Sequence, residues 1–96
     1  MVDQATRRRL KVAEDMRQLI RHAHPDLKRR IRAALHVILH DPSAGKALVE
    51  DLAGLHSFRI GRIRIIYRVV SDQTIEIVTI GPRKTVYEET FSLLKQ

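Results

Sequence analysis

The chain has 96 residues, 44% of them hydrophobic, and no cysteine. Its length suits one domain, expected over residues 1–96, and the missing thiols exclude disulfide bonds and thiolate zinc sites. The net charge of +7 favours an anionic partner, which could be a nucleic acid, an acidic protein or an anionic membrane surface. No apolar run has membrane-spanning length, so we expect a cytoplasmic protein without a membrane partner.

The first half of the chain has the periodicity of helices. Apolar residues recur at steps of three and four, which predicts a helix from about Gln4 to Ala23, with the basic run from Arg7 to Arg9 on its solvated face. His24 precedes a proline and therefore disfavours the helical conformation, so the helix should end there. A second helix is predicted from about Pro25 to Leu39, and the short joint makes the two helices antiparallel.

From Ser57 onward the periodicity changes to two, which is typical of strands. Three β-branched runs are predicted to be strands: Ser57–Ile60, Ile63–Val70 and Thr74–Ile80. A turn is predicted at Asp41–Gly45, Lys46–Leu55 stays open between a helical turn and an irregular connection, and a short helix is predicted over Val86–Leu94. We therefore expect an α+β fold, with two N-terminal antiparallel helices packed on a twisted antiparallel sheet of three to four strands, and a short C-terminal helix.

A tight turn between the first two strands predicts a pair of facing arginines. Gly61-Arg62 suits a two-residue hairpin turn, in which the glycine supplies a positive φ. The register of that hairpin places Arg59 opposite Arg64. Like charges directly opposite each other destabilise a hairpin, so this pair calls for a reason other than stability.

The second hairpin is predicted to add a third arginine. Its register pairs Arg68 with Glu76, which we interpret as a structural ion pair, and sets Arg64 opposite Ile80. Arg83 follows Ile80 by three residues and is expected over the same end of the sheet. Three guanidiniums without a nearby carboxylate would form an anion site, and the alternative is three solvated arginines that splay apart.

Three segments in the second half of the chain carry a family resemblance. They are Gly45–Gly61, Arg64–Val69 and Ile80–Tyr87. As an ordered set they resemble the RelE/ParE superfamily of bacterial toxins. The third segment, IGPRKTVY, is similar to the ending typical of the RelE branch, whose members are mRNA interferases.

This resemblance implies the toxin of a type II toxin-antitoxin system, a ribosome-dependent endoribonuclease that inhibits translation. Such enzymes cut mRNA through attack of the RNA's own 2′-hydroxyl on the adjacent phosphate, and electrostatics and positioning can support that reaction without a metal ion or another cofactor. The implied partners are a cognate antitoxin, the ribosome and mRNA, with operator DNA reached only through the antitoxin.

The resemblance also implies roles for particular residues. Arg64 matches the family's phosphate-binding arginine, Arg83 its arginine near the leaving group, and Tyr87 its C-terminal tyrosine, which orients or stacks on the substrate. Arg59 stands where a basic residue often stabilises the transition state. Three further basic residues are expected to contact RNA: Arg62, Lys84 and Lys46.

Two departures from the family pattern leave alternatives open. Residues 1–6 lack the pattern of the β-strand with which the family usually opens, so we expect an open sheet edge that a partner could fill. Gly61 stands where some members carry a lysine, which leaves the general base unassigned. The alternatives are a ParE-like toxin that binds DNA gyrase without nuclease activity, and a catalytically inactive binding protein.

The histidines give weaker signals. His36 and His40 have the i, i+4 spacing of metal ligands, but only Asp41 could join them, so polar surface histidines are the better interpretation. His56, just before the first arginine of the hairpin, is a minor acid–base candidate.

Overall fold

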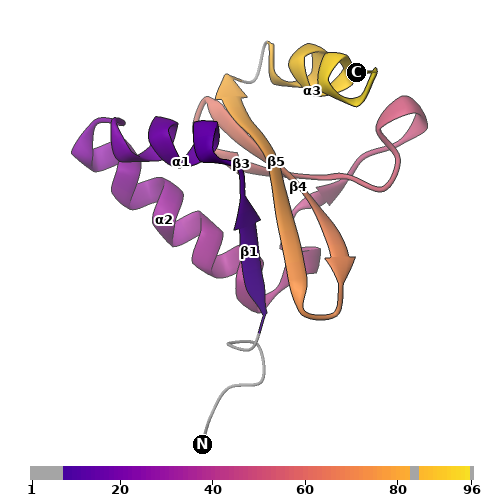
Figure 1. Cartoon of the computed structure of the whole chain (residues 1–96), viewed down its shortest axis with the longest axis horizontal. Coiled ribbons are helices and arrows are strands. Elements are labelled where there is room, and N and C mark those ends of the chain that lie inside the picture. The colour runs from indigo at the N-terminus through magenta and orange to yellow at the C-terminus, as the bar shows by residue number, and fades with distance from the viewer. Residues whose placement is uncertain (1–7, 83–84, 96) are drawn as a thin grey trace, which may run out of the picture.

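A five-stranded sheet forms the centre of the fold, in the strand order β1-β5-β4-β3-β2 (Figure 1). The structure is a computed structural model that describes residues 8–82 and 85–95. The strands are β1 (Arg9–Val12), β2 (Lys46–Ala47), β3 (His56–Ile60), β4 (Ile63–Ser71) and β5 (Thr74–Pro82). The helices are α1 (Glu14–Arg21), α2 (Pro25–His40) and α3 (Val86–Lys95), and two short 3-10 turns are η2 (Pro42–Ala44) and η3 (Glu50–Leu52).

The two faces of the sheet are covered by different helices. The face that carries Ile65 and Tyr67, here called the helix face, packs against α1 and α2. Four buried residues of α2 fill this core, as the periodicity predicts: Ile31, Ala34, Leu35 and Ile38. The opposite face, here called the α3 face, carries Arg59, Arg64 and Ile66, and Val86 of α3 packs on Ile66 in a smaller cluster.

Local signals explain where α2 begins and ends. Pro25 occupies the first turn, and the His24 ring accepts a hydrogen bond at 3.2 Å from the Asp26 amide, so both act as start signals. At the other end, the Arg8 guanidinium donates to the carbonyls of Leu39 (3.1 Å) and His40 (3.3 Å). A cation at a helix C-terminus satisfies carbonyls that lack helical partners. Arg8 is therefore a cap, and the expectation that it lies on a solvated helix face is wrong.

The expected helix from Gln4 to Ala23 is confirmed over Glu14–Arg21, which form α1, and is wrong at its described start, because residues 9–12 form β1. Leu10 and Val12 pack towards the core while Arg9 and Lys11 are exposed, which is the alternation of a strand. The sequence pattern predicted a longer helix because Leu10 also lies at helical spacing from the apolar residues of α1. The strand prevails since β1 pairs in parallel with β5 and satisfies its backbone groups.

This strand changes the expected sheet. The sheet has five strands and is mixed, instead of three to four antiparallel strands, because β1 runs parallel to β5. The edge that was expected to be open beside β5 is occupied by β1. The other strand pairs are antiparallel, as expected, and the α+β class with a short C-terminal helix is confirmed.

The hairpin registers agree with the prediction only in part. Arg59 lies opposite Arg64, and Gly61 has a φ of 58°, as the tight turn requires. Arg68 lies opposite Glu76, also as predicted. Beyond that pair a β-bulge shifts the register by one residue, so Arg64 faces Gly81 and the expected pairing with Ile80 is wrong.

The ambiguous segment before β3 contains β2 and the η3 turn. β2 pairs with β3 and places Lys46 opposite Ser57, which sets Lys46 on the α3 face. In the described part of the chain, no helix has both the length and the apolar character needed to cross a bilayer.

Candidate functional site

Two arginines stand side by side on the α3 face of the sheet. Arg59 on β3 and Arg64 on β4 are direct cross-strand partners, so both side chains leave the sheet on the same side. Arg59 is exposed, and its Nε donates to the Gly61 carbonyl at 3.1 Å. Arg64 is half-buried, which contrasts with the solvent-facing side chain expected for a surface strand. The expected convergence is confirmed for this pair.

Arg64 carries hydrogen-bonding capacity that the described residues do not use. Its Nη1 donates a long hydrogen bond of 3.4 Å to Ser57 Oγ, and its Cζ lies 5.9 Å from the centroid of the Tyr87 ring. Its Nε is buried without a hydrogen-bond partner, and no carboxylate within the described residues pairs with it. A half-buried guanidinium that no described carboxylate balances favours an incoming anion.

Tyr87 and Ser57 complete the cluster around Arg64. Tyr87 lies in the first turn of α3 and is half-buried, and its hydroxyl donates to Ser57 Oγ at 3.3 Å. Ser57 is only 3% exposed and accepts from both Arg64 and Tyr87. A serine oxygen has two lone pairs, so one hydroxyl can orient both side chains.

Ser57 was not among the site residues predicted from the sequence. The available signal was its position two residues before Arg59, which places both residues on the same face of β3. Its role depends on α3 bringing Tyr87 over the sheet, and that packing is not encoded in any spacing along β3.

The structure describes only some of the other residues expected to contact RNA. Lys46 lies opposite Ser57, and therefore on the same face as the cluster. Arg62 is exposed on the hairpin turn next to the arginine pair. Arg83 and Lys84 lie outside the described residues, so their expected positions stay predictions.

His56 does not join the arginines. It pairs with Tyr67 on the helix face, and their rings stack with centroids 5.3 Å apart. The acid–base prediction for His56 at this site is therefore wrong, since the sheet separates its ring from Arg64. His36 and His40 have ring centroids 4.1 Å apart, and no group of three or more potential ligands for a metal ion occurs among the residues that the structure describes.

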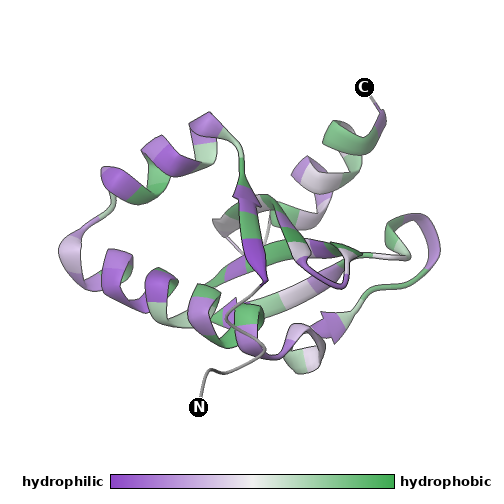
Figure 2. Cartoon of the chain, turned by 60° about the horizontal axis from the view of Figure 1, so that its bottom comes forward, coloured by the Kyte–Doolittle hydropathy of each residue, from purple (hydrophilic) through white to green (hydrophobic). Residues whose placement is uncertain are grey.

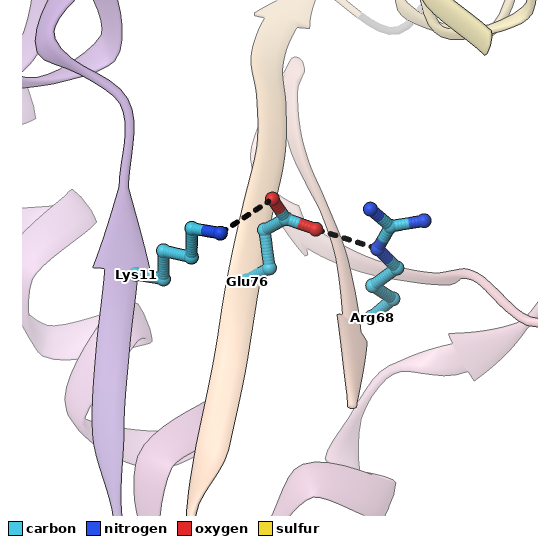
Figure 3. Close-up of polar contacts among 3 residues, drawn as sticks. All are labelled: Lys11, Arg68 and Glu76. Carbon is cyan, nitrogen blue, oxygen red and sulfur yellow. Dashed lines mark hydrogen bonds and ion pairs between the residues drawn. The ribbon is translucent and has the colours of Figure 1, made fainter. Parts of the chain in front are cut away.

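Arg68 shows what a neutralised arginine looks like on the same face. Its Nε donates to Glu76 Oε1 at 2.5 Å, and Lys11 Nζ lies 4.0 Å from the other carboxylate oxygen (Figure 3). The three residues come from three neighbouring strands, and the predicted ion pair is confirmed. Arg64 lies four residues before Arg68 on the same strand, closer to the turn at Gly61. It has no such carboxylate within the described chain, so no ion pair there balances its charge.

The arrangement offers a cation with unused donors, a second cation beside it, an aromatic ring and a hydroxyl within one cluster. Such a set can bind a phosphate bidentately, stabilise negative charge that develops on it, and orient an adjacent base against a ring. These groups suit the binding of a phosphodiester, and none of them is assigned as the general base.

Comparison with known families matches residues 6–87 to the family described as ParE toxin of type II toxin-antitoxin system, parDE. No curated protein sequence matches the chain.

Three solved structures of similar fold come from toxin-antitoxin complexes. A chain of the toxin-antitoxin complex RelBE2 from Mycobacterium tuberculosis is 26% identical, with a TM-score of 0.65, and the match covers 77% of this chain and 95% of that chain. A chain of the archaeal RelE-RelB complex from Pyrococcus horikoshii is 22% identical, with a TM-score of 0.63 and coverage of 80% and 96%. A chain of the YoeB-YefM complex from Staphylococcus aureus is 18% identical, with a TM-score of 0.65 and coverage of 78% and 95%.

Proposed function

Because the chain belongs to the RelE/ParE superfamily of type II toxin-antitoxin toxins, we propose that it is a ribosome-dependent endoribonuclease that cuts mRNA and so inhibits translation. The observation that carries this proposal is Arg64, a half-buried guanidinium with an unsatisfied Nε beside the Tyr87 ring. A cation held in this way by polar and aromatic neighbours fits a phosphate flanked by a base.

In the proposed reaction the 2′-oxygen of one ribose attacks the adjacent phosphorus. A P–O2′ bond forms and the P–O5′ bond breaks, which leaves a 2′,3′-cyclic phosphate and a 5′-hydroxyl. The 2′-hydroxyl proton passes to a base, and the departing 5′-oxygen gains a proton. Arg64 and Arg59 stabilise the negative charge of the phosphorane, Arg83 acts near the leaving group, and Tyr87 orients the substrate. Lys46, Arg62 and Lys84 hold the flanking phosphates. These cations supply the electrostatic stabilisation without a metal ion.

The proposed partners follow from the family. The matched structures from M. tuberculosis, P. horikoshii and S. aureus are toxin-antitoxin complexes, which supports a cognate antitoxin for this chain. With a net charge of +7, the chain favours an antitoxin segment that is acidic or amphipathic, and operator DNA would be reached only through the antitoxin. The ribosome would present the mRNA.

A second function is favoured by one specific observation. The matching family is described by its ParE toxins, which resemble this chain over residues 6–87. In this alternative the chain binds DNA gyrase and cuts no RNA. The cluster of Arg64, Ser57 and Tyr87 favours the nuclease, because a surface that only binds a protein has no need of a half-buried cation that no described carboxylate balances.

The two functions are separated by two assays on the same purified protein. Ribosomes programmed with a defined mRNA should release cleaved RNA, with ends that carry a 2′,3′-cyclic phosphate and a 5′-hydroxyl. Supercoiling by DNA gyrase should proceed unchanged. Inhibition of gyrase together with intact mRNA on the ribosome would reject the nuclease and establish the alternative.

A further inference from the structure

A cationic cleft lies between the two N-terminal helices, on the other side of the sheet from Arg64. Four basic residues line it, two from α1 and two from α2: Arg17, Arg21, Lys28 and Arg32. Val12 and Ile20 complete its lining, and its volume is about 310 Å³. Figure 2 shows that hydrophilic residues make up much of α1 and the first turns of α2, the two helices that form this cleft.

The four cations are arranged at a cost to stability. Arg17 and Arg21 are i, i+4 neighbours on α1, and Lys28 and Arg32 are i, i+4 neighbours on α2. Like charges at this spacing destabilise a helix. In this cleft two such pairs face each other, so a bound anion is the natural compensation.

Nearby carboxylates do not neutralise the cleft. Within residues 8–82 and 85–95, no acidic side chain lines it. The carboxylates of both helices are engaged elsewhere: Glu14 accepts from Gln18, Asp15 from the Met16 amide, and Asp26 pairs with Arg29. Arg17 is fixed in place, because its Nε donates to the Val12 carbonyl at 3.1 Å and leaves its terminal nitrogens for a ligand.

We propose that the cationic cleft binds the phosphodiester backbone of structured RNA at a place separate from the cleavage site. The cations form two pairs, one on each helix, and the Cβ atoms within a pair lie about 5–6 Å apart. Such pairs suit neighbouring phosphates of a strand, and guanidiniums bind phosphate bidentately. The helices and Arg64 cover opposite faces of the sheet, so an RNA that occupies both sites must be larger than the cleaved strand. That one RNA-containing particle occupies both sites rests on the proposed function. Binding of RNA to the cleft is tested independently of cleavage.

The test is the salt dependence of binding to an RNA hairpin whose riboses are 2′-O-methylated, which removes the attacking hydroxyl. Fluorescence anisotropy is measured between about 50 and 200 mM salt, where each phosphate contact contributes about 0.7–0.9 to the slope of log K against log salt. The cleft variant is Arg21→Gln with Arg32→Gln, which removes one cation of each pair and keeps the hydrogen bond from Arg17 to Val12. The matched control is Arg9→Gln with Lys95→Gln, two exposed cations outside the cleft.

The cleft variant should lose about 1.4–1.8 of the slope and bind at least tenfold more weakly at the lower salt, while the control changes little. Equal losses in both variants would mean that only net charge matters, and the cleft would be rejected. Displacement of the hairpin by polyglutamate as effective per charge as RNA, and equally sensitive to the cleft variant, would assign the cleft to an acidic protein instead. The melting temperature of the cleft variant should stay the same or rise, and a fall would contradict the cost on which the inference depends.

The outcome is independent of the proposed nuclease. If the wild type cuts no mRNA but the cleft variant still has a smaller slope of log K against log salt, the proposed nuclease function is rejected and RNA binding by the cleft is supported. If the wild type cuts mRNA and the slope is unchanged in the cleft variant, the cleft fails alone. Arg64→Ala should abolish cleavage and keep the cleft's contribution to the slope.

Discussion

At the scale of single residues, the proposed function depends on the difference between two arginines of β4. Arg68 shares Glu76 with Lys11, so its charge is balanced within the fold. Arg64 makes only a long hydrogen bond to Ser57 and a distant cation–π contact, with its Cζ 5.9 Å from the centroid of the Tyr87 ring. The first arginine stabilises the sheet, and the second is prepared to bind a ligand.

This difference makes a matched pair of variants. Arg64→Ala should lower the rate of mRNA cleavage roughly a hundred- to a thousandfold, the usual effect of removing one preorganised charge-stabilising group. Arg83→Ala is expected to do the same. Arg68→Ala, on the same strand and face, should cleave at nearly the wild-type rate. Cleavage on programmed ribosomes measures all three, and an Arg68→Ala loss as large as that of Arg64→Ala would mean that overall charge, not the cluster, drives catalysis.

Ser57 and Tyr87 should act as a unit. Ser57→Ala removes the acceptor of the Tyr87 hydroxyl, and Tyr87→Phe removes the hydroxyl itself, so each change breaks the same hydrogen bond. The double variant should therefore be little worse than either single one, with a coupling of about 0.5–3 kcal/mol in the cleavage barrier. Additive losses would show that the hydroxyl of Tyr87 serves the substrate directly and that Ser57 contributes only through Arg64.

At the scale of elements, Tyr67 connects β4 to the segment that leads into β2. Its side chain is fully buried, and its hydroxyl donates to the Pro42 carbonyl at 2.7 Å and accepts from the Gly45 amide at 2.9 Å. Burial raises the pKa of this phenol, the negative charge of Asp41 adds to the effect, and the Gly45 hydrogen bond opposes it. The neutral phenol thus holds the backbone next to Lys46, one of the predicted RNA contacts.

The raised pKa of Tyr67 predicts a loss of stability in alkali. The unfolded phenol gives up its proton as the pH passes about 10, whereas the folded phenol keeps it, so the free energy of unfolding falls above that pH. Below it the contribution is fully present. Tyr67→Phe should cost about 1–3 kcal/mol near neutral pH, because two buried backbone groups lose their partner, and should flatten the alkaline decline.

Urea unfolding from neutral pH to about pH 10.5 measures this effect, since the pH range brackets the ordinary phenol pKa. Tyr87→Phe is the control, because Tyr87 is the other tyrosine of the chain and this variant keeps Tyr67. An alkaline decline that is as steep in Tyr67→Phe as in the wild type would assign it to other groups.

The connection between β1 and α2 depends on Arg8. Its guanidinium caps the last carbonyls of α2, so Arg8→Ala should lower the free energy of unfolding by about 1 kcal/mol. Arg9→Ala is the control: it removes the neighbouring exposed guanidinium and should change stability by less than about 0.5 kcal/mol. Denaturant titration distinguishes the two, and equal effects would indicate that Arg8 contributes only its charge.

How far the sequence predicts these elements depends on how local their causes are. The first hairpin was predictable down to the pairing of Arg59 with Arg64, because a two-residue turn at Gly61 fixes the register. The bulge in β5 was not, because it interrupts a run of β-branched residues that looks uniform. β1 was also missed, since its partner β5 lies more than sixty residues away and short apolar patterns fit both periods.

At the scale of the whole molecule, the sheet separates the two surfaces to which we assign different tasks. The α3 face carries the cluster of Arg64, Ser57 and Tyr87, and the helices on the other face carry the cationic cleft. Composition alone predicted an anionic partner from the net charge of +7. Composition could not predict where on the surface the positive charge lies, because only the fold determines which cations pair with a carboxylate.

The candidate site was predictable to a similar extent. The arginine pair and Tyr87 came from the hairpin register and from the family resemblance, and the structure brings Arg64 and Tyr87 within 5.9 Å of each other. Ser57 escaped prediction because its importance arises from the packing of α3 across the sheet. The packing of α3, which orients the site, therefore has to be taken from the fold and not from the sequence pattern.

The most direct test of the central claim is to induce the protein in bacteria and map the 5′ ends of mRNA across the transcriptome. The account predicts new 5′-hydroxyl ends within translated regions soon after induction, and their absence when Arg64→Ala is induced to the same level. Arrest of growth without new ends in translated mRNA, accompanied by damage to chromosomal DNA, would contradict the nuclease and identify DNA gyrase as the target.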